Sequence, residues 1–373
     1  MAKLGDLYKI TSGGTPSRKH LEYYENGTIP WVKTGDLKSK YLYETDEKIT
    51  ENGLKNSSAR IYPKDTILIA MYGATIGATS ILKTEAATNQ ACAAFVKNDK
   101  IIPEYLYAFL ESQRNRFIKD AVGGAQPNIS AGYLKEIDIP LIPLNEQRRI
   151  AAVLDKVTNL IVQRRAQLDK LDLLVEALFN EMFGDPILNT KEFPVYKMKD
   201  VVQFEGGSQP DKSFFEYSPT ENNVRLIQIR DYKSNKFITY IPKSLARRFC
   251  TADDIMIGRY GPPIFQILGG IDGAYNVALM KATPKMGNRE FIRHFLKQKC
   301  LLHYLEGLSK RTAGQDGIQM DKLKEYPVPY PPVELQNQFS SFVEQTEKSK
   351  LTILESLDKL EMIKKALMQN YFG

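Results

Sequence analysis

Residues 144–183 read LNEQRRIAAVLDKVTNLIVQRRAQLDKLDLLVEALFNEMF, the longest stretch of the sequence with one regular pattern. Pro143 precedes it and Gly184-Asp185-Pro186 follows it, which is the pattern of a helix start and a helix stop. Its apolar residues fall on a seven-residue grid, spaced alternately three and four apart, with one polar exception. The grid consists of Ile150, Leu154, Val157, Ile161, Arg164, Leu168, Leu171, Val175, Leu178 and Met182. This spacing predicts one long helix with a coiled-coil seam, and a pair of ordinary core helices is the alternative.

The pattern occurs a second time, because the chain matches itself at a constant shift of 189 residues from Ala125 onward. Upstream the match continues with small gaps: Gly13-Gly14 faces Gly206-Gly207, Asp36 faces Asp231, Tyr72 faces Tyr260, and Asn89 faces Asn276. The second seam is weaker but keeps the same frame; it consists of Phe339, Val343, Thr346, Lys350, Ile353, Leu357, Leu360, Lys364, Leu367 and Tyr371. The chain is therefore two copies of one unit, each with a globular part of about 145 residues and a tail of about 40.

The repeat predicts an α+β architecture in which two sheet-centred domains are joined by two long antiparallel coiled-coil helices. A pseudo-two-fold axis across the coil would relate the halves, with one globular part at each end. The expected boundaries are 1–143 and 185–332 for the globular domains, and 144–184 and 333–373 for the helices. Within the globular domains we expect strands at 66–70, 93–96, 225–229 and 254–257, and helices at 103–120 and 288–308.

Composition bounds the class of protein. The net charge of +7 comes from 51 Lys and Arg against 44 Asp and Glu, and it divides as +2 over residues 1–144 and +6 over 185–333. Such an excess permits nucleic-acid binding without requiring it. Unbroken apolar runs such as Ile67 to Met71 are too short to cross a membrane, and the N-terminal residues lack an apolar signal core, so we expect a cytoplasmic protein. Three scattered cysteines and three scattered histidines predict neither disulfides nor a metal site.

The motifs of catalysis are absent from the sequence. Gly73-Ala-Thr-Ile-Gly77 lacks the lysine of a phosphate-binding loop, and no [DNS]PP[YFW], HExxH or GxSxG motif occurs. We therefore expect no catalytic residue and no cofactor.

Two divergent globular regions, each followed by a matching heptad helix, resemble the specificity subunit of type I restriction–modification enzymes over essentially the whole chain. The local signatures are Gly13-Gly-Thr-Pro-Ser17, Ile29-Pro-Trp-Val-Lys33, Gly35-Asp36, Asp65-Thr-Ile-Leu-Ile-Ala-Met-Tyr-Gly73-Ala-Thr-Ile-Gly77, Thr88-Asn-Gln90 and Pro143-Leu-Asn-Glu-Gln147-Arg-Arg-Ile150. The second copy departs from them, because Gly77 and Gln90 have no counterpart and its helix opens Pro332-Val-Glu-Leu-Gln336.

The resemblance implies two target-recognition domains, each reading one half of a split sequence in double-stranded DNA, with the helices fixing the gap. It implies a subunit without chemistry of its own that assembles with two adenine-methylating modification subunits, which bind near the helices. Motor–nuclease subunits join such complexes for restriction.

Base readout needs forked donors and amides in a groove, and phosphate contacts need cations, hydroxyls and backbone N–H groups. Residues of these types lie in loops at matching places of the two copies. The DNA-binding candidates are Thr15, Ser17, Arg18, Lys33, Thr34, Tyr72, Gln126 and Asn128 in the first domain, and Ser208, Gln209, Lys212, Gln228, Arg230, Tyr260, Arg311 and Gln315 in the second. The alternative for each is that it shapes a loop or is a solvated surface charge.

Two other functions remain open at the level of sequence. One is a coiled-coil scaffold protein without DNA specificity, which would show no salt-dependent DNA binding. The other is an enzyme that acts alone on DNA, in which case the purified chain should cleave or methylate it.

Overall fold

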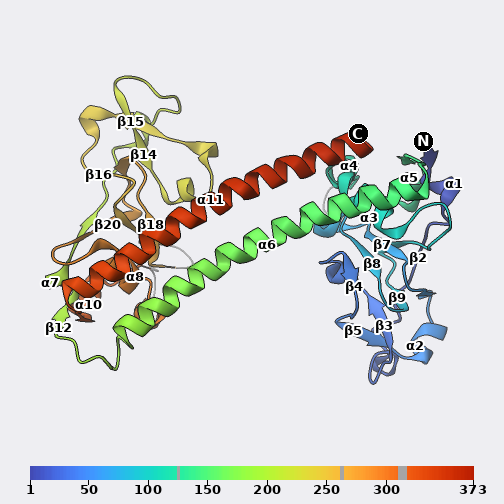
Figure 1. Cartoon of the computed structure of the whole chain (residues 1–373), viewed down its shortest axis with the longest axis horizontal. Helices are drawn as coiled ribbons and strands as arrows, with labels where there is room; N and C mark the ends of the chain where they lie inside the picture. The colour runs from blue at the N-terminus through green and yellow to red at the C-terminus, as the bar shows by residue number, and fades with distance from the viewer. Residues whose placement is uncertain (124–126, 261–263, 310–316) are drawn as a thin grey trace. The chain divides into compact units, whose positions relative to one another are not determined.

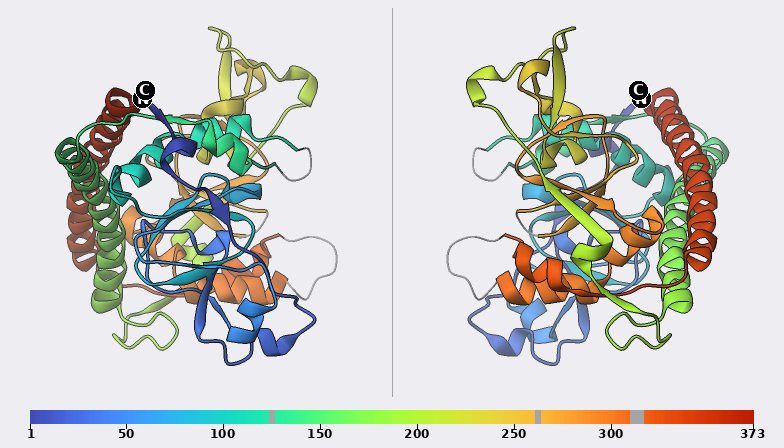
Figure 2. Two further views of the ribbon diagram at one scale, coloured as in Figure 1. Left: turned by 90° about the vertical axis from the view of Figure 1, so that its right-hand side faces the viewer. Right: turned by 90° about the vertical axis from the view of Figure 1, so that its left-hand side faces the viewer.

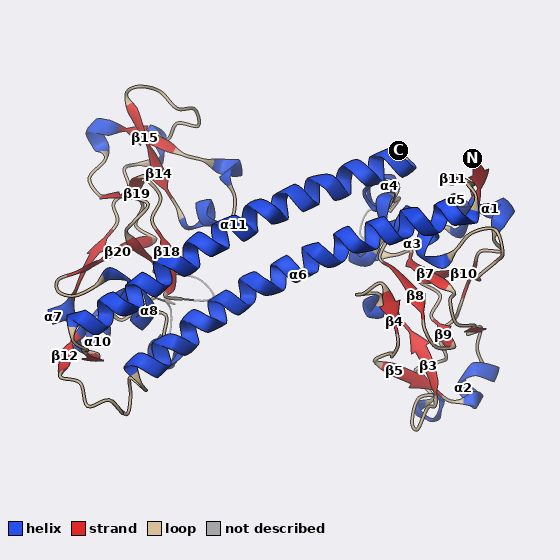
Figure 3. Cartoon of the chain, viewed as in Figure 1, coloured by secondary structure: helices blue, strands red, loops and turns tan. Residues whose placement is uncertain are grey.

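The computed structural model describes residues 1–123, 127–260, 264–309 and 317–373. It consists of two compact units: unit 1 contains Met1–Arg165 and Leu354–Gly373, and unit 2 contains Ala166–Ile353. Two long helices, α6 (Leu144–Phe183) and α11 (Val333–Phe372), contribute a segment to each unit (Figures 1 and 3). The part of a unit outside these helices is called its head. Among the residues that the structure describes, no helix is long and apolar enough to span a lipid bilayer.

The head of unit 1 is built on two sheets, called inner and outer by their distance from the long helices (Figures 1 and 2). The inner sheet has the strand order β2 (Thr11–Ser12), β10 (Cys92–Phe95), β7 (Ile67–Ala70), β8 (Thr79–Leu82) and β4 (Tyr41–Leu42). The outer sheet has the order β5 (Glu47–Ile49), β3 (Ile29–Val32), β9 (Ala86–Thr88) and β6 (Ile61–Tyr62). A short pair, β1 (Ala2–Lys3) with β11 (Asp138–Ile139), closes the head beside α6.

The head of unit 2 repeats this topology in the order of its strands, with the exception of β4. Its inner sheet has the order β13 (Val202–Gly206), β20 (Leu279–Pro284), β17 (Ile255–Gly258) and β18 (Gln266–Gly269). Its outer sheet has the order β15 (Tyr240–Pro242), β14 (Asn223–Ile227), β19 (Gly273–Tyr275) and β16 (Phe249–Cys250), and β12 (Val195–Lys197) pairs with β21 (Pro327–Pro329). Of the described strands, β4 alone lacks a counterpart. The internal repeat and the α+β fold class predicted from the sequence are therefore confirmed.

The core of each unit lies where its inner sheet meets the long helices. In unit 1, β7 is buried on both faces, and α3 (Pro103–Ser112) packs between the sheet and α6. The ring of Phe372 from α11 lies 5.3 Å from Tyr105 and 5.6 Å from Phe109. Unit 2 has the equivalent aromatic cluster, in which Phe183 lies 5.0 Å from Phe291 and 5.4 Å from Phe339. Helix and head thus share one apolar core, which fixes each head on its helix segments.

The predicted seam is confirmed by burial. Every residue of the α6 grid is buried or partly buried, including Arg164, and so is every residue of the α11 grid. The two helix segments run antiparallel in each unit. Arg165 pairs with Glu361 at 2.6 Å in unit 1, and Lys350 pairs with Asp172 at 2.5 Å in unit 2. The apolar grid therefore stabilises the pairing of the helices as well as the packing of the heads.

A buried glutamine at the start of each long helix ties it to its head. Gln147 donates from Nε2 to the carbonyls of Lys100 and Ile142, both at 2.8 Å, and its Oε1 accepts from the Ile102 amide at 2.9 Å. Gln336 makes the equivalent contacts, with the Pro331 carbonyl and the Asn288 amide, both at 2.8 Å. Both side chains are fully buried. The glutamine of each helix-opening signature therefore has a structural role.

Two local expectations need correction. The helix expected at 103–120 is divided into α3 and α4 (Arg114–Asp120), and that at 288–308 into α8 (Arg289–Leu296) and α9 (Lys299–Ser309). The first break lies at Gln113, whose ψ of −3° and short-range hydrogen bonds to Phe109 and Leu110 turn the chain. The glycine match between the two copies also needs a shift of one residue, because Gly13 corresponds to Gly207 and not to Gly206. The backbone amide that follows Gly13 donates to the Thr88 carbonyl, and the one that follows Gly207 donates to the Tyr275 carbonyl. Thr88 and Tyr275 are the equivalent last residues of β9 and β19.

Candidate nucleic-acid interface

Five of the candidates of unit 1 lie in the loops that follow β2 and β3, and hydrogen bonds hold these loops together. The Gly14 amide donates to the Thr88 carbonyl at 2.9 Å, and the Trp31 indole donates to the Gly14 carbonyl at 3.1 Å. Beyond these contacts Thr15 donates to Gln90 Oε1 at 2.5 Å. Thr15, Ser17 and Arg18 are exposed, and Lys33 and Thr34 are partly exposed. The structure therefore brings these five candidates to one surface region.

Glu47, at the start of β5, joins two of the candidates and was not found from the sequence. Its Oε2 binds Arg18 Nη2 and its Oε1 binds Lys33 Nζ, both at 2.6 Å. The guanidinium of Arg18 also lies 4.2 Å from the Tyr24 ring centre, a cation–π contact. The hydrogen bond from Lys33, reinforced by Arg18, lowers the pKa of Glu47 despite partial burial. In this cluster the Glu47 carboxylate thus holds two cationic side chains, Arg18 and Lys33, at the outer sheet.

Tyr72 and Asn128 lie on a neighbouring loop of the same head. They face each other in an isolated antiparallel bridge, and the Gly73 amide donates to the Pro127 carbonyl at 2.9 Å. The Met71 amide binds the Ala91 carbonyl at 2.9 Å, which places this loop beside the turn that carries Gln90. Tyr72 is 38% exposed. Gln126 lies outside the described residues.

Unit 2 repeats the arrangement with different side chains. The Ser208 backbone amide donates to the Tyr275 carbonyl at 3.1 Å, and Gln209 Oε1 accepts from Asn276 Nδ2 at 3.5 Å. Gln228 Nε2 and Arg230 Nη2 both donate to the hydroxyl of Thr239 at 3.1 Å. Lys212 is exposed in η4 (Lys212–Phe214), and no hydrogen bond or ion pair among the described residues ties it to the other candidates.

Tyr260 lies in the second loop of unit 2. It forms an isolated antiparallel bridge with Gly317, as Tyr72 does with Asn128 in unit 1. The guanidinium of Arg259 lies 5.4 Å from the Tyr260 ring centre and donates to the Val277 carbonyl at 3.4 Å. Arg259 was missed by the sequence analysis, although its position beside a repeated tyrosine could have suggested it. Arg311 and Gln315 lie outside the described residues.

A buried aspartate orients the loop after β3 and the loop after β14. Asp36 Oδ2 accepts from the Lys33 amide at 2.7 Å, and Asp231 Oδ2 accepts from the Gln228 amide at 3.0 Å. Burial raises the pKa of Asp36. These carboxylates fix the backbone from which Lys33 and Gln228 project, so their role is to position the neighbouring side chains.

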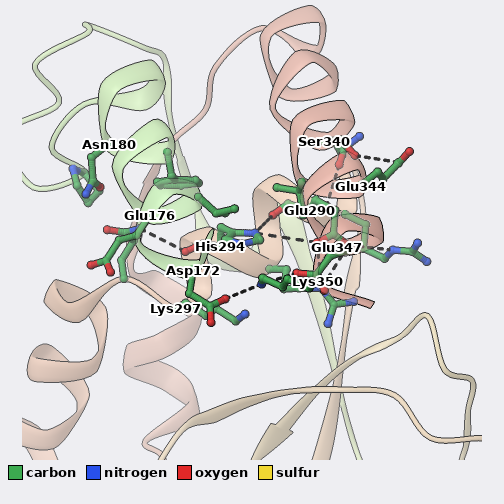
Figure 4. Close-up of a pocket in the computed structure, with 18 of the residues that line it drawn as sticks. Asp172, Glu176, Asn180, Glu290, His294, Lys297, Ser340, Glu344, Glu347 and Lys350 are labelled. Atoms are coloured by element: carbon green, nitrogen blue, oxygen red, sulfur yellow. Dashed lines mark hydrogen bonds and ion pairs between the residues drawn. The ribbon is translucent and has the colours of Figure 1, made fainter. Parts of the chain in front are cut away.

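A separate cavity of about 1520 Å³ lies in unit 2, bounded by α6, α8 and α11 (Figure 4). Acids and bases alternate on its wall: Lys350 binds Asp172 and Glu347, at 2.5 and 2.7 Å, and Arg293 lies 3.3 Å from Glu290. Such a wall lacks the cationic excess that attracts phosphates. No group of three or more His, Cys, Asp or Glu able to hold a metal ion occurs in the part of the chain that the structure describes.

Comparison with known proteins finds a matching family model, related sequences and solved structures of the same fold. The family model described as the type I restriction modification DNA specificity domain matches residues 1–170 and 190–365. The MjaIX specificity subunit of Methanocaldococcus jannaschii is 34% identical over 226 residues, covering 55% of this chain and 52% of that protein. The EcoR124I/EcoR124II specificity subunit of Escherichia coli is 30% identical over 162 residues, covering 42% of this chain and 40% of that protein. These matches thus span about half, or less, of the relatives' lengths.

Two solved structures share the fold along the whole chain. The S subunit of a type I restriction–modification system from M. genitalium has a TM-score of 0.59 at 16% identity, with 100% of this chain and 95% of that chain covered. A structure from a study of assembly and conformational transition in the type I system has a TM-score of 0.61 at 18% identity, with 100% and 96% covered.

Proposed function

Because the chain belongs to the family of type I restriction modification DNA specificity domains, we propose that it is the sequence-specific DNA-recognition subunit of a type I restriction–modification complex. The observation that carries this proposal is the repeated head. Apart from β4 the two heads share one strand order, yet their loops present different polar side chains: Lys33 of unit 1 corresponds to Gln228 of unit 2, and Arg230 of unit 2 corresponds to Gly35. One scaffold with two different polar surfaces suits a target with two different halves.

In this proposal residues 1–143 and 185–332 are the target-recognition domains, and the helices 144–184 and 333–373 set the gap between the half-sequences. The candidate residues in the loops of each head contact the bases and phosphates of double-stranded DNA. The chain supplies recognition, while methyl transfer and cleavage belong to its partners, two modification subunits and, for restriction, motor–nuclease subunits, in the cytoplasm.

Repeated apolar residues on the long helices support two copies of one partner. Unit 1 exposes Val162, Met362 and Ile363, and unit 2 exposes Leu351, Leu173 and Leu174 at the positions related by the repeat. The exposed fractions agree pair by pair: 59% and 61%, 64% and 62%, and 48% and 50%. Apolar exposure reproduced in both copies, while the head loops diverge, favours a shared docking role. Each unit would bind one modification subunit.

The function is tested by purifying the chain alone and together with the modification subunits of its proposed complex. We expect the chain alone to bind DNA weakly, because its net charge is only +7, and the assembly to bind its target tightly with an affinity that falls as salt rises. Assembly without any salt-dependent DNA binding would favour the scaffold alternative instead.

The docking surfaces are tested separately by charge insertion. Leu173→Asp in unit 2 and Met362→Asp in unit 1 should each remove one modification subunit from the assembly, and the double variant should remove both. Leu160→Asp is the matched control, because Leu160 is 37% exposed but its repeat counterpart is Ser349. Mass measurement of the complexes gives the count, and undiminished assembly of the double variant would contradict these surfaces.

A further inference from the structure

Glu47 and Thr239 occupy the same place in the two outer sheets. In unit 1, Trp31 of β3 pairs with Glu47 on one side and with Ala87 of β9 on the other. In unit 2, the Leu226 amide of β14 donates to the Thr239 carbonyl at 2.8 Å, and Leu226 pairs with Ala274 of β19. Since β3 corresponds to β14 and β9 to β19, the two residues are equivalent although no sequence match connects them.

Each of these residues gathers two donors that belong to the proposed interface. Glu47 binds Lys33 and Arg18 with one carboxylate oxygen each, at 2.6 Å. The Thr239 hydroxyl accepts from Gln228 and Arg230, both at 3.1 Å. Lys33 and Gln228 are themselves equivalent, because the backbone amide of each is held by a buried aspartate. The second donor is an arginine in both heads, from the loop after β2 in unit 1 and from the loop after β14 in unit 2. The shared acceptor is thus a carboxylate in one head and a neutral hydroxyl in the other.

The clusters leave hydrogen-bonding capacity free. Lysine has three N–H donors, arginine five and the glutamine amide two, so one bond to the shared acceptor does not exhaust any of them. The side chains of Arg18, Lys33 and Glu47 are 54%, 31% and 32% exposed, so they are held in place while open to solvent. An ion pair of that exposure adds little to stability, and its main physical effect is to fix the direction of the donors.

We propose that Glu47 and Thr239 are specificity-determining residues, each aligning two donors with the base edges of its own half-sequence. In unit 1 the chemistry fits a guanine–cytosine pair, because Arg and Lys donate to guanine O6 and N7 and a carboxylate accepts from the cytosine amino group. In unit 2 the neutral acceptor adds no charge, and Gln228 and Arg230 read purine acceptors. This inference rests on the proposed function.

The test uses the full chain assembled with its modification subunits and a DNA library randomised in both half-sequences. Glu47→Gln removes the charge that aligns Lys33 and Arg18, and Thr239→Val removes the hydroxyl. We expect Glu47→Gln to weaken base preference at one position of one half-sequence by roughly tenfold or more, with the other half unchanged. Thr239→Val should do the same in the other half.

Matched controls and a second variant separate the outcomes. Glu44→Gln and Thr283→Val change exposed residues of the same types and should leave both halves unaltered. Gln228→Met leaves the buried Thr239 intact and should relax the same position as Thr239→Val. A bipartite wild-type target whose preferences survive Glu47→Gln and Gln228→Met overturns this inference alone. A wild-type assembly without a bipartite target overturns the proposed function itself.

Discussion

At the scale of single residues, glycines allow backbones to meet where the candidate loops begin. A Cβ atom built on Gly13 would lie 1.9 Å from the Thr88 carbonyl oxygen, and one on Gly207 would lie 1.9 Å from that of Asn276. Both neighbours are backbone atoms at the ends of equivalent strands. The repeated glycine therefore serves a close approach that positions Thr15 and Gln209, which the sequence match alone did not distinguish from loop flexibility.

We predict that Gly13→Ala destabilises the protein, whereas Gly35→Ala in the same head does not. The added methyl group of Gly13→Ala must displace the β9 backbone, an overpacking that costs on the order of 1–3 kcal/mol. No atom lies within 4 Å of a Cβ on Gly35. Thermal unfolding of both variants measures the difference, and equal midpoints would contradict the close approach.

Glu325 provides a prediction on pH. Hydrogen bonds from Lys197 and Lys199, at 2.7 and 2.5 Å, lower its pKa from the ordinary 4.5 to about 2. A depressed pKa in the folded state means that the carboxylate contributes stability above pH 4.5, which is lost as the pH falls toward 2. Glu325→Gln should therefore unfold at a lower temperature than wild type at pH 7, with the gap closing by pH 2. A difference in unfolding temperature that grows on acidification would contradict a stabilising role for the Glu325 carboxylate.

At the scale of elements, the long helices were predictable and the outer sheets were not. Heptad spacing is a local signal, so the sequence alone defines α6 and its seam. The pairing of β3 with β9 is parallel and joins residues 31 and 87, and that of β14 with β19 joins 226 and 274. Such long-range contacts leave no local periodicity. Glu47 and Thr239 were missed for the same reason, because their equivalence follows from strand register.

The helix-opening glutamines give an element-scale prediction. Gln147→Leu keeps the side-chain size but removes the hydrogen-bond partner of the three backbone groups that contact the fully buried Gln147 side chain, the Lys100 and Ile142 carbonyls and the Ile102 amide. Each unsatisfied buried group costs about 1–3 kcal/mol, so the variant should lose at least about 2 kcal/mol of unfolding free energy. Gln163→Leu, at an exposed position of the same helix, is the control. Denaturant unfolding compares the two variants. An unchanged free energy of unfolding in Gln147→Leu would contradict a stabilising role for the Gln147 hydrogen bonds.

At the scale of the whole molecule, the repeat suggests how the gap between half-sequences can be changed without changing either half. Seven residues inserted after Arg165 and seven after the repeat-related Leu354 keep the heptad frame of both helices. Seven helical residues add about 10 Å, which corresponds to about three base pairs at 3.4 Å each. We expect the same half-sequences with a gap about three base pairs longer.

Four residues inserted after Arg165 alone are the contrasting variant, because they shift one seam against the other. That change should alter the gap or abolish binding. Selection of bound sequences from a random library identifies the two half-sequences and measures the length of the gap between them. An unchanged gap in the seven-residue variant would mean that the helices do not set the spacing.

We propose that one chain reads two separate half-sequences with its two heads. A map of methylated adenines in DNA from cells that make this chain with its modification subunits tests it most directly. We expect methylation within a target of two specific parts separated by a gap of unspecified sequence, and loss of that pattern when the chain is omitted. Methylation at a single uninterrupted sequence, or a pattern that does not depend on this chain, would contradict it.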